Sequence, residues 1–142
     1  MWRSAQITLL PRERGIHLVT ADVVEGLGAS LQEISVGLCH LHLAHTSAAL
    51  TLNENASPEV RGDLERWLDR AAPDGAPFFR HTLEGPDDMA AHVKASLLGV
   101  GLLLPVRDGR LALGTWQGIQ LVEARDRGGA RRILATVWGE GR

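Results

Sequence analysis

The chain has 142 residues, 15 basic and 17 acidic side chains, and a formal net charge of −2. This length suits one domain over residues 1–142 with a core of its own, and the small net charge argues against nucleic acid or a charged membrane surface as a partner. A single cysteine, no run of about 18 apolar residues and no signal-peptide layout at the N-terminus favour a cytoplasmic protein.

The first third of the chain predicts three strands and one helix. Alternating apolar residues and turn signals place the strands at residues 2–9, 15–20 and 34–43. Between the second and third strands, Asp22 can cap a helix that runs to about Leu31, although two glycines weaken it.

Residues 45–55 predict a continuing strand with one unusually polar face. At a period of two, that face carries small polar groups and one histidine, while the other face has an apolar centre. The polar face consists of His45, Ser47, Ala49, Thr51, Asn53 and Asn55. Short polar side chains suit the wall of a pocket for a polar ligand. A solvated edge or a polar contact between subunits is the alternative.

Two further helices follow. Ser57 and Pro58 are typical of a helix start, and an apolar stripe continues to Ala71; it comprises Val60, Leu64, Trp67, Leu68 and Ala71. The next helix runs from Asp87 or Asp88 to Leu98 and stops at Gly99. Its expected buried side comprises Met89, Val93, Ser96 and Leu97.

The last third predicts two hairpins. One joins residues 100–106 to 110–116 around Asp108-Gly109, and the other joins 119–125 to 131–138 around Gly128-Gly129. Strands in both halves with two or three helices between them indicate an α+β fold with antiparallel sheets, in one compact domain.

The helix after Asp87 carries the first candidate site. Asp88 and His92 lie four residues apart and therefore on one helix face, where a carboxylate can orient an imidazole or join it as a metal ligand. Asp88 can equally stabilise the helix dipole. His81 and Glu84 precede this helix and His45 lies on the polar strand, so three histidines near acids are candidates for a divalent metal. No short metal motif ties them together.

Three other features are candidates for ligand binding. Lys94 is the one lysine beside fourteen arginines, which indicates either a need for a compact ammonium or a compositional bias. Trp116 can stack on a heterocycle while Thr115 and Gln117 hydrogen-bond its edge; the alternative is a core tryptophan. Arg125 can hold phosphate oxygens or form a surface ion pair.

Four ordered motifs, at residues 45–55, 84–89, 92–96 and 114–119, together resemble the YjbQ-like family, described as secondary thiamine-phosphate synthases. The likeness extends to Trp2 and to residues 15–20 and 128–133. It implies a compact α+β homotrimer with a weak activity that joins a pyrimidine diphosphate to a thiazole phosphate. Ser57 stands where members of this family typically have an acidic residue, and Phe79 stands where a tyrosine is frequent. This chain therefore lacks a negative charge at the first position and a hydroxyl at the second.

The reaction implied by this resemblance assigns roles to the candidates. Departure of diphosphate would be stabilised by Mg²⁺ and by cations, so the catalytic candidates are His45, His81, His92 and Lys94. The substrate-binding candidates are Ser47, Asn53, Asn55, Thr115, Trp116, Gln117 and Arg125. The metal candidates are Glu84, Asp88 and His92, with Zn²⁺ as the alternative to Mg²⁺. A metal-dependent hydrolase and a non-catalytic module for phosphorylated metabolites are the competing hypotheses.

Overall fold

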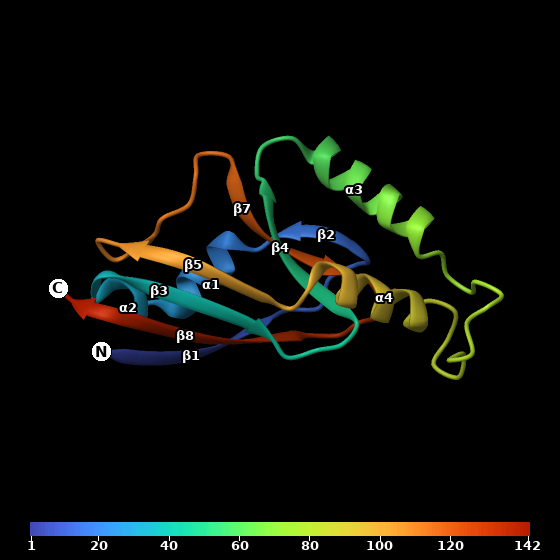
Figure 1. Cartoon of the computed structure of the whole chain (residues 1–142), viewed down its shortest axis with the longest axis horizontal. Coiled ribbons are helices and arrows are strands. Elements are labelled where there is room, and N and C mark those ends of the chain that lie inside the picture. The colour runs from blue at the N-terminus through green and yellow to red at the C-terminus, as the bar shows by residue number, and fades with distance from the viewer.

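The computed structural model describes residues 1–142 as two antiparallel sheets with four helices (Figure 1). In sheet order, the five-stranded sheet comprises β1 (Trp2–Leu9), β8 (Arg131–Gly141), β3 (Ile34–Leu43), β5 (Gly101–Arg107) and β6 (Arg110–Leu111). The three-stranded sheet comprises β2 (Gly15–Leu18), β7 (Gln117–Glu123) and β4 (Ala48–Glu54). The helices are α1 (Thr20–Leu27), α2 (Ala29–Gln32), α3 (Pro58–Ala71) and α4 (Asp88–Leu98). The predicted α+β class with antiparallel sheets is confirmed.

The main core lies between the inner faces of the two sheets. Alternate residues of β3, such as Leu41, pack in one apolar cluster with Leu50 of β4 and Leu121 of β7. Helix α1 closes this core with Val23. Leu68 of α3 packs with a second, smaller cluster on the opposite face of the three-stranded sheet; its other members are Ile16, Ala49 and Val122.

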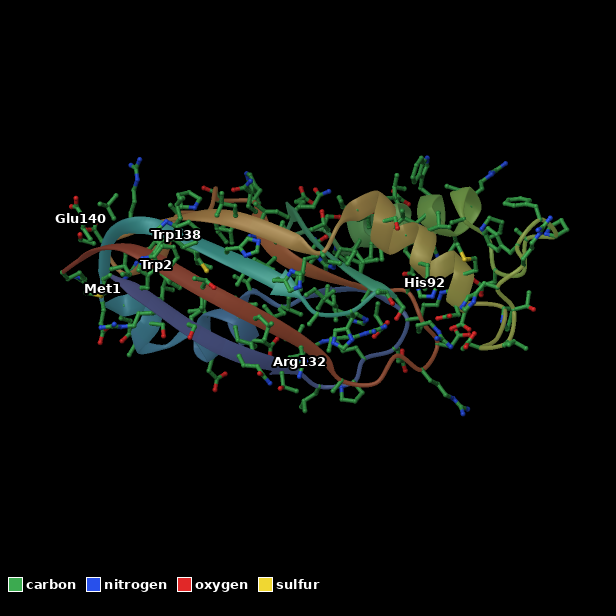
Figure 2. The ribbon with its side chains drawn as sticks, turned by 60° about the horizontal axis from the view of Figure 1, so that its bottom comes forward. Met1, Trp2, His92, Arg132, Trp138 and Glu140 are labelled. Atoms are coloured by element: carbon green, nitrogen blue, oxygen red, sulfur yellow. The ribbon has the colours of Figure 1, made fainter.

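The outer face of the five-stranded sheet has no such cover. Its large side chains are exposed, namely Trp2, Val36, Leu103 and Leu134. Trp2 stacks on Trp138 of the neighbouring strand, with 5.2 Å between the ring centroids, and the pair lies at the end of the molecule opposite His92 (Figure 2). None of the helices combines the length and apolar character that crossing a membrane would need.

The predicted helix from Asp22 to Leu31 is wrong in its bounds. Helix α1 already begins at Thr20, and Asp22 lies in its first turn rather than at its cap. Helix α1 ends before Gly28, whose φ of 48° and ψ of −126° are outside the helical region. Helix α2 then forms as a separate short helix.

Helices α3 and α4 form where expected but bury other side chains. Trp67 of α3 is 59% exposed, so the predicted apolar stripe is wrong at this position. Helix α4 buries Asp88 and Lys94 together with its alanines, whereas Leu97 of the predicted buried side is 59% exposed. Small alanine side chains allow the helix to lie close to β4, and this close packing outweighs the burial of longer apolar residues.

The strands of the second predicted hairpin do not pair with each other. Strand β7 lies between β2 and β4, whereas β8 lies between β1 and β3 in the other sheet. The polar segment also departs from the prediction, because β4 begins only at Ala48 and residues 45–47 form a loop. Within β4, Ala49 on the supposedly open polar face is buried in the cluster under α3. This face is therefore a packing surface over part of its length.

Candidate functional site

The start of α4 brings two histidines onto one carboxylate. Nε2 of His81 lies 2.6 Å and Nε2 of His92 lies 3.0 Å from the same oxygen, Oδ2 of Asp88. The three ligand atoms lie within 4.8 Å of one another, which is close enough to hold one metal ion. We call this group the His81–Asp88–His92 cluster. The predicted contact between Asp88 and His92 is present, and it follows from the spacing of four residues on a helix.

The carboxylate of this cluster is buried and held by Arg125. Burial alone would raise the pKa of Asp88, but the hydrogen bond with His81 and the charges of His92 and Arg125 outweigh it and lower the pKa below its ordinary value. Arg125 donates to both Asp87 and Asp88 and to the backbone carbonyl of Glu84. Its guanidinium therefore joins the start of α4 to the end of β7, and each of its three nitrogens donates one hydrogen bond within the protein.

The orientation of His92 is set by a backbone carbonyl. Its Nδ1–H donates to the carbonyl oxygen of Thr46 at 2.8 Å, and a carbonyl can only accept. A neutral ring then leaves a lone pair on Nε2, which faces the Asp88 oxygen 3.0 Å away. Two acceptors at this distance repel each other unless a proton or a metal ion lies between them. Metal-binding histidines typically donate their second ring N–H to such a carbonyl.

The donor set fits a divalent metal of the zinc type. Two imidazole nitrogens and one carboxylate oxygen are the protein ligands of many catalytic zinc sites, which leave a fourth position open. Of the three predicted metal ligands, the cluster contains Asp88 and His92, and His81 takes the third place. Glu84 lies beside it, with Oε2 at 3.2 Å from Nε2 of His81, and its side chain is 54% exposed.

Lys94 lies away from the cluster. Positions 92 and 94 point to nearly opposite sides of a helix, and the Lys94 ammonium is buried, donating to Oδ1 of Asp69 at 2.6 Å. Arg14 donates to the same oxygen at 3.0 Å. Lys94 therefore joins α4 to α3, and the structure does not bring it together with His92.

The pH dependence of stability should report this contact. Burial alone would raise the pKa of Asp69, but the hydrogen bonds from Lys94 and Arg14 outweigh it and lower the pKa. The ionised Asp69 therefore contributes fully to the free energy of unfolding above the pKa of this residue in the unfolded chain, about 4. The contribution is lost as the pH falls through the lower pKa of Asp69 in the folded protein. Urea unfolding from pH 7 to pH 3 should show a constant difference between wild type and Asp69→Asn above about pH 5. That difference should shrink in acid; a constant difference at every pH would contradict the assignment.

The first residues of the predicted polar strand contact the start of β8. The hydroxyl of Ser47 accepts a hydrogen bond from Arg131 at 3.0 Å, and Arg131 is paired with the buried carboxylate of Glu123. Nε2 of His45 accepts from the backbone N–H of Arg132 at 2.8 Å. Ser47 is therefore bound within the protein, while His45 keeps its Nδ1 edge free of protein partners.

The remaining predicted ligand groups lie at the other end of β4. Asn55 donates to the backbone carbonyls of Thr115 and Gln117, and the Gln117 side chain accepts from the N–H of Gly114. Trp116 is 64% exposed, and no ring stacks on it. Asn53 accepts from the following backbone N–H. The seven residues of β4 span about 20 Å, so a single chain does not bring this corner to the His81–Asp88–His92 cluster.

Sequence reasoning missed the partners that hold the site in place. Asp69 and Arg14 fix the back of α4, and the Thr46 carbonyl orients His92. Any residue type would supply that carbonyl, so no sequence signal marks it. Asp69 is one of several acidic residues in α3, and nothing in the sequence marks it as the partner of Lys94.

The comparisons with known proteins agree with this fold. The family model described as "UPF0047 protein YjbQ-like" matches residues 5–140. The chain is 54% identical to UPF0047 protein YjbQ of Salmonella typhimurium over 140 residues, covering 99% of this chain and 100% of that protein. It is 38% identical to UPF0047 protein YugU of Bacillus subtilis over 125 residues, covering 87% and 89%. A YbjQ-like protein of unknown function from Sulfolobus solfataricus superposes with a TM-score of 0.85 at 27% identity, covering 99% of both chains.

Proposed function

The chain belongs to the UPF0047 protein YjbQ-like family, and from the geometry of its site we propose that it is a metal-dependent enzyme acting on small phosphorylated molecules. The proposal rests on two imidazole nitrogens that converge on one buried carboxylate oxygen, with Nε2 of His81 at 2.6 Å and Nε2 of His92 at 3.0 Å from Oδ2 of Asp88. A bound metal ion supplies a Lewis acid that polarises a phosphoryl oxygen. His81, Asp88 and His92 would hold it.

The finer proposal is transfer, with thiamine phosphate as the product. It is supported by the sequence resemblance and by the three protein ligands of the cluster, which would leave a position on a bound metal ion for a diphosphate oxygen. Two cations assigned to the leaving group from the sequence are engaged elsewhere, because Lys94 pairs with Asp69 and Arg125 with Asp87 and Asp88. Stabilisation of the leaving diphosphate then falls to the metal site and to donors around it.

Hydrolysis is the second candidate. Two imidazoles and one carboxylate are typical of zinc hydrolases, and the Glu84 carboxylate lies beside the cluster with its side chain 54% exposed. An exposed carboxylate at this place is suited to hold and deprotonate a water molecule. In this alternative, a water molecule at the same metal site would take the place of the thiazole nitrogen as the nucleophile.

Two measurements test the proposal. Metal analysis of the purified protein should find about one divalent ion per chain, with zinc favoured over magnesium by the nitrogen ligands. Incubation with both thiamine precursors should give thiamine phosphate, whereas release of diphosphate from the pyrimidine diphosphate alone would favour the hydrolase. His92→Ala should abolish either activity, and His42→Ala, an exposed histidine on the outer sheet face, should not. A protein that binds no metal would contradict the proposal, and metal with ligand-induced stabilisation but no turnover would identify a binding module.

We also infer that the chain self-associates, as a homotrimer, through the outer face of the five-stranded sheet. Support comes from the exposed Trp2, Val36 and Leu103 on a face that nothing in the chain covers. Light scattering should give three times the mass of one chain, and Leu103→Glu should lower this mass without unfolding the protein. A wild-type monomer would remove the inference.

A further inference from the structure

A groove beside the His81–Asp88–His92 cluster has no acidic residue in its lining. The hollow is about 410 Å³ in volume, and its lining includes His45, Thr46, His92 and Ser96. No carboxylate lines it, so an anion that enters meets no fixed negative charge there. His92 links this groove to the His81–Asp88–His92 cluster, because its two ring nitrogens contact Thr46 and Asp88.

The tautomer of His45 is fixed by the backbone at the start of β8. Nε2 accepts the backbone N–H of Arg132 at 2.8 Å, so this nitrogen carries no proton. Partial burial and the positive charges of Arg131 and Arg132 lower the pKa of His45, against a weaker opposite effect of Glu123, and keep the ring neutral at pH 7. The proton of the neutral ring is therefore on Nδ1, which has no hydrogen-bond partner in the chain.

We propose that the Nδ1–H of His45 donates a hydrogen bond to a phosphoryl oxygen of a substrate bound in the groove that His45 and His92 both line. The inference rests on the proposed function, since it places the phosphoryl group between the metal site and this donor. Hydrogen bonds to charged oxygens are the stronger ones, and a donor whose tautomer is fixed needs no reorganisation when the anion binds. The exposed hydroxyl of Ser96, one turn after His92 on α4, is a second donor on the same groove.

This role differs from acid–base catalysis. A general base needs a free lone pair, and the lone pair of His45 already accepts the Arg132 N–H. His45 thus binds and orients the substrate, while the cluster around Asp88 carries the metal. Loss of the donor should raise KM far more than it lowers kcat.

Two substitutions separate this role from a structural one. In His45→Gln, the longer amide reaches the place of Nε2 and keeps the Arg132 contact, but the donor at the Nδ1 position is lost. In His45→Asn, the shorter amide keeps a donor near the Nδ1 position and loses the Arg132 contact. Titration of metal-loaded protein with inorganic phosphate should give a Kd about tenfold or more higher for His45→Gln, consistent with loss of a hydrogen bond to a charged group. His45→Asn and the His42→Ala control should bind within about threefold of wild type.

The outcomes are distinguishable from failure of the proposed function. Metal content is measured first, and a protein without metal contradicts the metal site itself. Histidine ¹⁵N spectra of the full chain then read the tautomer without any substrate; at pH 7 they should show His45 protonated on Nδ1 only. A spectrum with the proton on Nε2, or on both nitrogens, would overturn the inference. So would phosphate affinity unchanged in His45→Gln, equal weakening in both variants, or no phosphate binding by metal-loaded wild type.

Discussion

Asp88→Asn should bind no stoichiometric metal and should lose the proposed enzymatic activity. The substitution removes the negative charge from the one oxygen that both His81 and His92 approach. The amide can still accept the hydrogen bond from Arg125, so the start of α4 keeps that contact. Loss of an outer partner alone costs up to about 100-fold in metal affinity, and loss of a ligand should cost more. Competition with a chelator of known affinity measures the change.

Asp87→Asn is the matched control for that variant. Asp87 is equally buried and accepts from Arg125 and from the backbone N–H of Asp126, but it contacts neither histidine. The control should therefore bind metal like wild type while losing stability. Stoichiometric metal in Asp88→Asn, or equal metal loss in both variants, would show that the cluster is not the ligand set.

Arg131→Met should lower the free energy of unfolding by about 3–5 kcal/mol, the range for breaking a buried ion pair. Side-chain exposure is 4% for Arg131 and 0% for Glu123, and two nitrogens of the guanidinium donate to the carboxylate. The variant leaves the Glu123 charge buried without its partner. In a chain of this length the loss corresponds to roughly 10 °C in Tm. Urea unfolding followed by circular dichroism measures it.

The double variant Arg131→Met with Glu123→Leu identifies the cause. Replacing both members of a buried pair by apolar groups removes the unpaired charge, so much of the stability should return. Ser47 loses its donor in the single and the double variant alike, so this contact cancels in the comparison. A double variant as unstable as the single one would show that packing, rather than the unpaired charge, causes the loss.

Local spacing predicted the part of the site that local geometry determines. Asp88 and His92 face each other because four residues make about one helical turn. His81 joins them through the path of the loop before α4, which no periodicity describes. The carbonyl of Thr46 comes from another element, and backbone groups leave no trace in the residue types.

Errors arose where long-range packing decides. Strands β7 and β8 were expected to pair because a glycine-rich turn joins them, yet each finds its partners in a different sheet. Helix α4 exposes Leu97 because its alanine side packs closer to β4. Strand β4, at about 3.3 Å per residue, separates the candidate ligand groups around Asn55 from the His81–Asp88–His92 cluster, so a site that combines them would need a second chain.

The order of the strands has a consequence for folding during synthesis. Strands β7 and β8 are the last to be made, yet each lies in the middle of its sheet, between β2 and β4 and between β1 and β3. Until β8 has emerged, β1 has no partner strand and β3 can pair only with β5. Such non-local pairing slows folding and leaves the growing chain open to aggregation. Arg125 follows β7, so its contact with Asp88 also forms only then, and we expect the proposed metal ion to bind late in folding.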